Sequence, residues 1–193
     1  MYEYISGKIT ELTPACAVVE NNGIGYLVHI SLTTYTHLFG TEKAMLYLHH
    51  VVREDAQLFY GFFSRQEREL FRLLISVSGV GPNTARMMLS STSPDEIQKA
   101  ISTANILVLK SIKGIGQKTA ERIIVDLRDK INKAGAQDEI LSGGHNTIKE
   151  EALSALLMLG FSRNANEKVL NNLLAENAGL SAEELVKQAL KLL

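Results

Sequence analysis

The chain has 193 residues, 46% hydrophobic and 21% charged, which is typical of an ordinary folded protein rather than of a disordered or membrane-embedded one. No apolar run approaches the roughly 18 residues that a membrane span needs, and the start of the chain lacks a secretory signal pattern, so we expect a cytoplasmic protein. The single cysteine, Cys16, excludes an internal disulfide and any metal site built from several cysteines.

The net charge of −1 hides a segregation of charge along the chain. Residues 1–64 carry three basic and six acidic side chains, residues 65–134 carry twelve and seven, and residues 135–193 carry five and eight. A basic block between two acidic blocks predicts separate structural units, with the affinity for a polyanion confined to the middle one.

The first segment, residues 1–64, alternates short apolar stretches with turn residues, as β-strands do. The expected strands cover residues 2–12, 15–20, 24–30, 44–52 and 57–63, with a short helix over residues 32–39. Five strands and one small helix in a segment of this length predict a small barrel of the OB type.

The second segment, residues 65–133, is expected to be all helical, because the spacing of apolar residues changes at Arg65 from every second residue to about every three and a half residues. Ser93-Pro94 and Asn105 introduce further helices, and a long amphipathic helix is expected over residues 119–133. The small and polar residues that follow, 134–146, predict a flexible linker.

The third segment, residues 147–193, is predicted to be a small three-helix bundle. A side-chain oxygen followed three residues later by a glutamate satisfies opposite amides at a helix start. This pattern occurs three times, at Thr147/Glu150, Asn164/Glu167 and Ser181/Glu184. The whole chain is therefore expected to be a multidomain α+β protein, in which this tethered bundle is an adaptor.

The second segment contains an internal repeat with an offset of 35 residues, which aligns residues 76–85 with residues 111–120. Both serines, both pairs of glycines, the threonine and the alanine match, and the aliphatic residues are exchanged conservatively. In each copy a helix ends, a Gly-aliphatic-Gly turn follows and a second helix begins, so the sequence predicts tandem helix-hairpin-helix motifs.

Glycine turns of this kind bring backbone amides to the positive end of a new helix, where they bind phosphate oxygens. We expect Val80 and Ile115 to point inward and fasten the two turns. The predicted DNA-binding residues are Gly79, Val80, Gly81, Asn83 and Thr84 in the first hairpin and Gly114, Ile115, Gly116, Gln117, Lys118 and Thr119 in the second. Because amides and Lys118 contact phosphates rather than base edges, binding is expected to ignore base sequence.

Several kinds of chemistry are not predicted. Lys118-Thr119 follows Gln117 instead of the glycine that a phosphate-binding P-loop requires, so no ATPase is expected. The five histidines are scattered, and no metal site, cofactor or catalytic residue is expected.

Residues 53–56 lie between the last two expected strands and predict a hairpin tip with two exposed carboxylates, Glu54 and Asp55. On its own this segment is a solvated turn. On a DNA-binding protein it would repel phosphates by roughly 1 to 4 kcal/mol for each close pair of charges.

The barrel, the tip at residues 51–57, the paired hairpins with Gly-Ile-Gly-Gln-Lys-Thr-Ala-Glu-Arg at residues 114–122, and the tethered tail together resemble the RuvA family of Holliday junction-binding subunits. The resemblance covers essentially the whole chain. Single hairpins occur in many DNA-binding proteins, whereas the acidic tip and this order of units are specific to the family. One departure is Asn83, where the family often has a basic residue.

The resemblance implies a non-catalytic subunit of a DNA helicase complex that acts in recombination and repair. It implies a homotetramer, with one tetramer or two (an octamer) on a four-way junction, and Glu54 and Asp55 as an acidic pin at the crossover. It also implies that the tail, with Leu156, Leu157, Leu159 and Phe161, binds the hexameric ATPase RuvB, and that the resolvase RuvC joins later. These four apolar residues are also expected in the bundle's own core.

Two other functions stay open at this point. The second hairpin also looks like that of base-excision glycosylases, in which a lysine at the position of Lys118 attacks the sugar and a downstream aspartate assists. The matching position here is Asp138, in the expected linker, while Asp126 and Asp129 come too early. The other alternative is an adaptor that recruits a nuclease to duplex DNA without a preference for junctions.

Overall fold

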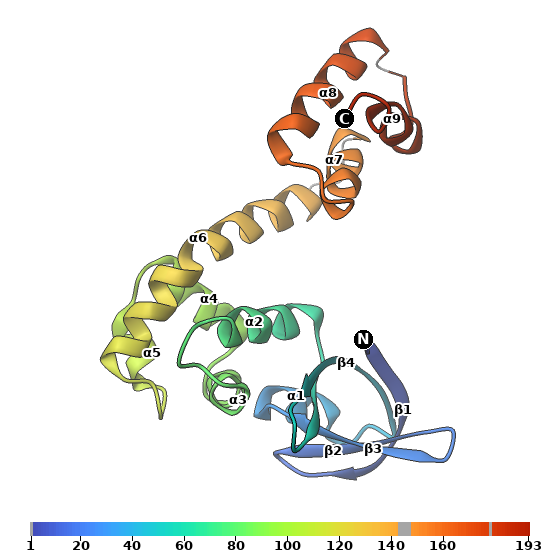
Figure 1. The fold of residues 1–193 in the computed structure, drawn as a ribbon. Helices are drawn as coiled ribbons and strands as arrows, with labels where there is room; N and C mark the ends of the chain where they lie inside the picture. The colour runs from blue at the N-terminus through green and yellow to red at the C-terminus, as the bar shows by residue number, and fades with distance from the viewer. Residues whose placement is uncertain (1, 143–147, 178) are drawn as a thin grey trace. The chain divides into compact units, whose positions relative to one another are not determined.

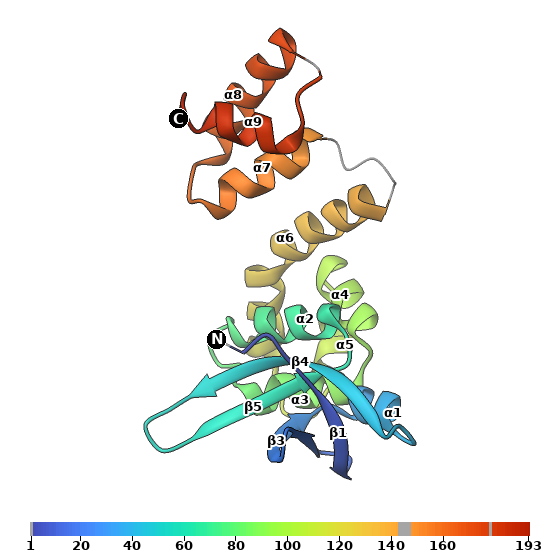
Figure 2. The ribbon, with the colours of Figure 1, turned by 90° about the vertical axis from the view of Figure 1, so that its right-hand side faces the viewer.

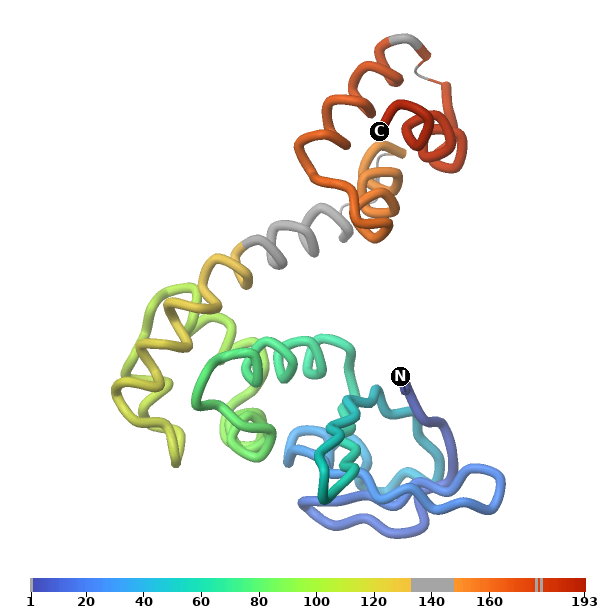
Figure 3. The backbone as a smooth tube through the Cα atoms, in the orientation of Figure 1, coloured from blue at the N-terminus to red at the C-terminus, as the bar shows by residue number. Residues whose placement is uncertain are grey.

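The computed structural model describes residues 2–142, 148–177 and 179–193. Its backbone divides into two compact units, Met1–Lys133 and Ala134–Leu193 (Figures 1 and 3). Each unit has its own buried core, and the boundary between them coincides with the end of the basic block of the sequence.

The first unit begins with a closed five-stranded barrel in the strand order β1-β2-β3-β5-β4. Its elements are β1 (Tyr4–Leu12), β2 (Cys16–Asn21), β3 (Ile24–Ile30), α1 (Leu32–Leu38), β4 (Lys43–Val52) and β5 (Gln57–Phe62). The β3–β5 pair is parallel and the other pairs are antiparallel. This arrangement confirms the predicted barrel, and each strand lies within two residues of its expected bounds.

The barrel closes because alternate residues of its strands are apolar and face a common interior. Val19, Val28, Leu46 and Leu48 belong to this core and are almost fully buried. The turn between β2 and β3 is an Asn-Gly pair, in which Asn22 and Gly23 both have positive φ, as tight hairpin turns require.

Five helices follow the barrel: α2 (Arg65–Ile75), α3 (Pro82–Ser91), α4 (Pro94–Ser102), α5 (Ile106–Ser111) and α6 (Gln117–Ser142). Side-chain oxygens of Ser64, Ser93 and Asn105 accept amide hydrogen bonds at the starts of α2, α4 and α5. Such caps satisfy amides that would otherwise lack partners, which explains why the helices begin at these residues.

The barrel and these helices share one core. Tyr60 and Phe62 of β5 are buried against Phe71 of α2, with ring centroids 5.2 Å and 4.8 Å from that of Phe71. Thr33 donates a hydrogen bond to the carbonyl of Leu89 in α3, at 2.7 Å. Figure 2 shows α2 and α3 beside the β4–β5 side of the barrel. The barrel therefore fixes the position of the first hairpin.

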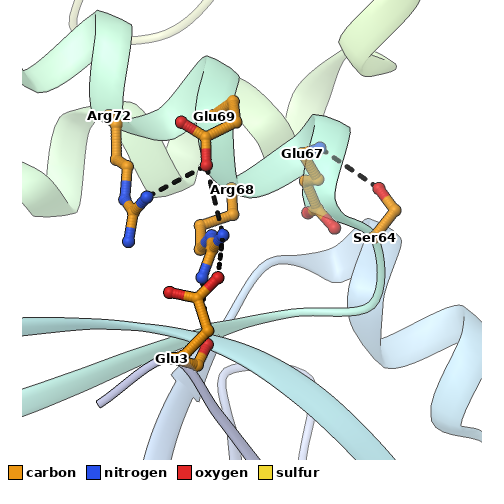
Figure 4. A network of polar contacts seen from close by, with 6 residues as sticks. All are labelled: Glu3, Ser64, Glu67, Arg68, Glu69 and Arg72. Carbon is orange, nitrogen blue, oxygen red and sulfur yellow. Dashed lines mark hydrogen bonds and ion pairs between the residues drawn. The ribbon is translucent and has the colours of Figure 1, made fainter. Parts of the chain in front are cut away.

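An ion-pair network ties the start of the chain to α2 (Figure 4). The buried guanidinium of Arg68 contacts the Glu3 carboxylate at 2.6 Å and the Glu69 carboxylate at 3.2 Å, and Glu69 also pairs with Arg72 at 3.0 Å. Arg68 lies 5.4 Å from the ring centroid of Tyr47, so it also makes a cation–π contact with β4.

A second polar cluster is buried between α1 and α2. The Glu67 carboxylate accepts hydrogen bonds from the hydroxyls of Ser31 and, at 2.8 Å, Thr34. Both hydroxyl oxygens in turn accept backbone amides, from Thr34 and Phe63. Burial raises the pKa of Glu67, while the two hydroxyl donors limit that rise.

This raised pKa predicts a dependence of stability on pH. The contribution of Glu67 to folding is fully present below the ordinary value of 4.5 and is lost as pH rises through the raised pKa. We expect the difference in free energy of unfolding between the natural protein and Glu67→Gln to fall as pH rises above about 4.5. Urea unfolding followed by tyrosine fluorescence measures it, because all six tyrosines lie between residues 2 and 60. A difference that stays constant as pH rises would contradict this prediction.

The structure differs from the expected linker. Helix α6 continues through residues 134–142, and residues 143–146 of the predicted linker lie outside the described residues. Seven of these nine added positions hold residues other than glycine and serine, mainly alanine, glutamine, glutamate and leucine types that favour helices. The single Gly135 does not end the helix. The division into a DNA-binding part, a linker and a motor-binding part stays a prediction.

The second unit contains α7 (Ile148–Met158), α8 (Arg163–Glu176) and α9 (Ala182–Ala189), which pack around a small leucine-rich core. The capping pair at Ser181/Glu184 is present. The expected cap at Asn164 is wrong: Ser162 is the residue before α8, and Glu167 pairs with Arg163 at 2.8 Å instead. Thr147 lies outside the described residues.

Among the described residues, no helix combines the length and apolar character needed to cross a membrane.

Candidate nucleic-acid interface

The first hairpin consists of α2, the turn at residues 76–81 and α3. Gly79 has φ +91°, a backbone conformation that L side chains rarely adopt, which explains the glycine there. The amide of Val80 donates to the carbonyl of Val77 at 3.0 Å, and the amide of Ala85 donates to Gly81 at 2.9 Å, where α3 starts. The turn is therefore a short, closed link that leads directly into the start of a helix.

The second hairpin, formed by α5, the turn at residues 112–116 and α6, repeats this geometry. Gly114 also has φ +91°. Ile115 donates to Ile112 at 3.1 Å, and Ala120 donates to Gly116 at 2.9 Å. Equal φ angles and matching hydrogen bonds confirm that the sequence repeat is a structural repeat.

The second glycine of each turn has a different reason to be glycine. Gly81 is extended, with φ −86° and ψ 169°, and any residue can adopt this conformation. A Cβ atom at Gly81 or Gly116 would meet no protein atom within 4 Å. The fold itself therefore does not require glycine at these positions, but a ligand that approaches the backbone closely would.

Both helix starts are open to such a ligand. Gly81 provides no side chain to cap α3, and Pro82 occupies its first turn. The first amides of a helix have no acceptor within that helix and carry its partial positive charge. Two bare helix starts, held by the same turn, can each bind an anion such as a phosphate.

The aliphatic residue between the glycines lies inside, as predicted. Val80 and Ile115 are each 5% exposed and belong to the core of the first unit, together with Val77 and Ile112. Only the backbone of Val80 and Ile115 can therefore face a ligand.

The two hairpins differ in side-chain charge. The second has exposed cations on both sides of its turn, Lys113 before Gly114 and Lys118 in the first turn of α6. The first has the exposed, uncharged Asn83 in the position equivalent to Lys118. We therefore expect the second hairpin to attract phosphates from a greater distance.

The remaining predicted hairpin side chains are those of Thr84, Thr119 and Gln117. Thr84 and Thr119 are half-buried in the first turns of α3 and α6. The exposed side-chain amide of Gln117 donates one of its two N–H groups to the Glu121 carboxylate within α6. A role of these three side chains in DNA binding stays a prediction.

Sequence reasoning missed two residues that hold the hairpins in place. Arg122 of α6 donates to the carbonyl of Ser78 at 3.3 Å and so links the second hairpin to the turn of the first. Tyr60 of β5 donates to Oδ1 of Asn83 at 3.2 Å. Arg122 is the last residue of the hairpin motif at residues 114–122, so the motif could have indicated its role. No sequence pattern indicates a role for Tyr60.

The acidic tip has the expected form. The β4–β5 hairpin reverses at residues 53–56, where the amide of Arg53 donates to the carbonyl of Ala56 at 2.8 Å. Glu54 and Asp55 are exposed at this turn. Figure 2 shows the closed end of the hairpin projecting away from the barrel, which places two carboxylates at its extremity.

The arrangement gives no support to the lyase alternative. Asp126 and Asp129 lie in the same helix as Lys118, about 12 Å and about 16 Å further along its axis at the normal helical rise. Asp138 lies further still along α6. Neither Asp126 nor Asp129 therefore brings a carboxylate beside Lys118.

Three histidines of the barrel strands, His29, His49 and His50, pack against aromatic rings. His49 packs edge-on against Phe71, and His50 stacks on Phe59 with ring centroids 4.7 Å apart. Burial lowers the pKa of His49 and His29, which favours their neutral forms. Among the described residues, no group of three or more acidic, histidine or cysteine side chains is placed to hold a metal ion.

The four apolar residues predicted to bind a motor fall into two groups. Leu156 is fully buried and Phe161 packs against the same bundle core. Leu157 and Leu159 are 38% and 59% exposed at the end of α7, on either side of the even more exposed Met158. The first pair therefore belongs to the bundle core, and the second pair and Met158 are apolar side chains open to solvent near the end of α7.

Three family models match this chain. The model described as the RuvA N-terminal domain matches residues 1–61, the SAM-like helix-hairpin-helix tandem matches residues 71–129, and the RuvA C-terminal domain matches residues 147–193. The matches follow the barrel, the two hairpins and the helical bundle.

Curated relatives match over the whole chain. A protein of Bacteroides fragilis is 49% identical over 99% of both chains, one of Bacteroides thetaiotaomicron is 47% identical over 99% of both, and one of Porphyromonas gingivalis is 46% identical over the full length of both. Each of these relatives is named Holliday junction branch migration complex subunit RuvA.

Proposed function

This chain belongs to the RuvA family, and we propose that it is the DNA-binding subunit of a branch migration complex, where it holds Holliday junctions. The observation that carries this proposal is the pair of identical glycine turns, each of which leaves a helix start uncovered by protein. The likeness to relatives with this name extends over all three parts of the chain.

We propose that each hairpin binds one strand through its phosphates. The amides at the starts of α3 and α6 donate to phosphate oxygens, and Lys118 adds a charge-assisted contact. Because these groups do not reach base edges, the affinity depends on the shape of the DNA and not on its base sequence. This property suits a protein that must hold a moving junction at any sequence.

The acidic tip suits a junction better than it suits linear duplex. Glu54 and Asp55 repel phosphates, so a continuous duplex has no favourable place for them. At the centre of an open four-way junction the strands separate, and carboxylates from several copies can occupy the gap. We therefore propose that a homotetramer surrounds the crossover, with one tip from each subunit as a pin, and that a second tetramer can complete an octamer.

Competition binding tests the proposal. We expect an immobile four-way junction to displace labelled junction from the full chain at a much lower concentration than linear duplex of the same arm sequence. Equal competition by both DNAs would refute junction holding and favour an adaptor for duplex DNA. Changing the arm sequences at constant shape should leave the affinity unchanged.

Substitution of Lys118 tests the charged contact of the second hairpin. In Lys118→Ala, the slope of log affinity against log salt concentration should fall by about one for each subunit on the DNA, because one phosphate contact is lost. Fluorescence anisotropy with labelled junction at several salt concentrations measures this slope. The control Lys168→Ala removes another exposed lysine, from α8, and should keep the natural slope. An unchanged slope in Lys118→Ala would exclude Lys118 from phosphate binding.

We further propose that the C-terminal unit binds the hexameric ATPase RuvB, and that the chain works in the cytoplasm as a subunit without catalytic activity, with the resolvase RuvC acting on the same junction. The exposed Leu157, Met158 and Leu159 support this role, because adjacent apolar side chains on a small domain are typical of protein-binding surfaces. Leu156 and Phe161 would act indirectly, through the bundle core that presents this surface.

Deletion of residues 148–193 tests the division of labour. The first unit has its own core, so the truncated chain should bind junctions with near-natural affinity. It should no longer stimulate the ATPase activity or the branch migration of RuvB. Stimulation that survives the deletion would place motor binding elsewhere in the chain.

A further inference from the structure

We propose that Tyr60, a buried barrel residue, is a positioning residue for DNA binding: it holds the carbonyl oxygen of Asn83 so that the side-chain amide nitrogen faces the phosphate. This inference rests on the proposed function of the hairpins. It concerns the one hairpin whose side chain at the phosphate-facing position is uncharged.

The contact that carries the inference joins the barrel to the first hairpin. Tyr60 lies in β5 and is 2% exposed, whereas Asn83 is exposed in the first turn of α3. The Tyr60 hydroxyl donates to Oδ1 of Asn83 at 3.2 Å. A residue from the barrel core thus reaches the edge of the predicted DNA-binding surface.

The direction of this hydrogen bond follows from burial. The phenol is a buried donor that needs an acceptor, and the amide oxygen of Asn83 provides one. Burial also raises the pKa of Tyr60, so its hydroxyl remains protonated at neutral pH. The opposite orientation of the amide would leave the phenol proton unpaired and turn the Asn83 oxygen towards the approaching phosphate.

With its oxygen held, Asn83 can present only donors to a ligand. A free asparagine can rotate about χ1 and can turn its amide over, and in half of those orientations the oxygen would repel phosphate. The hydrogen bond from Tyr60 removes these alternatives. The neutral Asn83 thereby becomes a directed donor beside the bare start of α3.

Neighbouring contacts keep Tyr60 itself in place. Its ring lies 5.2 Å from that of Phe71 and 5.5 Å from that of His29, centroid to centroid. On the side of α3, Arg86 donates to the carbonyl of Ala15 at 2.9 Å and fixes the helix against the barrel. The two ends of the Tyr60–Asn83 hydrogen bond are therefore both rigidly supported.

A double-mutant cycle on the full chain tests the inference. Affinities for a four-way junction and for linear duplex are measured for the natural protein, Tyr60→Phe, Asn83→Ala and the double variant. We expect Tyr60→Phe to weaken binding about three- to sixfold, because three χ1 wells and two amide orientations become available to Asn83. In the Asn83→Ala background, Tyr60→Phe should have no further effect.

Asn83→Asp separates positioning from simple anchoring of the hairpin. An aspartate keeps an acceptor for the Tyr60 hydroxyl, so a purely structural contact would survive and Asn83→Asp would bind at least as tightly as Asn83→Ala. If the nitrogen faces phosphate, the aspartate places a negative charge there, and binding should be weaker than in Asn83→Ala. Thermal unfolding of each variant checks that the first unit remains folded.

The control is Tyr26→Phe, which removes the hydroxyl of a half-buried barrel tyrosine that bonds no side chain in the described part of the chain. It should bind like the natural protein. Additive effects of Tyr60→Phe and Asn83→Ala, or natural binding by Tyr60→Phe or by Asn83→Asp, would overturn the inference. Equal affinity of the natural protein for junction and linear duplex would instead refute the proposed function. The double-mutant cycle measured on linear duplex would still show whether Tyr60 acts through Asn83.

Discussion

Replacing Gly81 and Gly116 together by valine should reduce the affinity for junction DNA by more than about a hundredfold while leaving the fold intact. Each valine would place a branched side chain over a bare helix start, where the protein leaves open space. The loss corresponds to at least two hydrogen bonds to charged phosphates, each worth about 1.5 to 3 kcal/mol. Anisotropy titrations with labelled junction measure the affinity, and circular dichroism with thermal unfolding checks the fold.

This pair of glycines gives a sharper test than the first glycine of each turn. Gly79 and Gly114 have φ +91°, so a side chain there strains the backbone, and lost binding could follow from a damaged turn. The matched control is Gly179→Val in the second unit, where φ is not in the left-handed range and a Cβ meets only an ordinary contact at 3.5 Å. Natural affinity in the Gly81 and Gly116 double variant would show that these turns do not approach DNA.

Reversing the charge of the tip, with Glu54→Lys and Asp55→Lys, should strengthen DNA binding by about tenfold or more and impair branch migration. The lysines replace repulsion of phosphates by attraction, with about 1 to 4 kcal/mol at stake for each close pair of charges. A tip that holds strands would also slow their passage through the crossover. Affinity is measured by titration, and migration by the conversion of a labelled junction to duplex products in the presence of RuvB.

The control for the tip changes charge equally at the other end of the barrel. Glu11 and Glu42 are exposed near the start of β4, and that strand extends about 30 Å before it reaches the tip. Glu11→Lys with Glu42→Lys should alter affinity only slightly and leave migration natural. Natural migration by the tip variant would remove the pin role, and equal effects of both variants would reduce it to net charge.

The parts of this protein that sequence could predict are those with a strong local cause. The strands of the barrel follow from alternating apolar residues between turn residues, and Asn22-Gly23 indicates a tight turn directly. The two hairpins follow from the repeat, since positive φ at Gly79 and Gly114 leaves few other residues possible. The inward position of Val80 and Ile115 follows from the same turn geometry.

The parts that sequence could not predict depend on contacts between distant segments or on competition between neighbours. The hydrogen bond between Tyr60 and Asn83 joins residues 23 positions apart, and the one between Arg122 and Ser78 joins residues 44 apart. Neither has a local pattern. The start of α8 was misplaced because Ser162 and Asn164 are both good caps, and burial of Asn166 favours the earlier start.

The extent of α6 illustrates a third limit. Small and polar residues beyond Lys133 indicated a linker, but most of them are also tolerated in a helix that is already formed. Propagation of an existing helix requires only one residue to be ordered at a time, whereas composition alone treats each segment as if it had to nucleate its own structure.

A structure of this chain bound to an immobile four-way junction would test most directly whether the two glycine turns bind DNA phosphates. We predict phosphate oxygens at about 3 Å from backbone amides at the starts of α3 and α6, next to Gly81 and Gly116. Both hairpins should make this contact on the same DNA. A complex in which the two glycine turns face only protein or solvent, with DNA held by other surfaces, would contradict it.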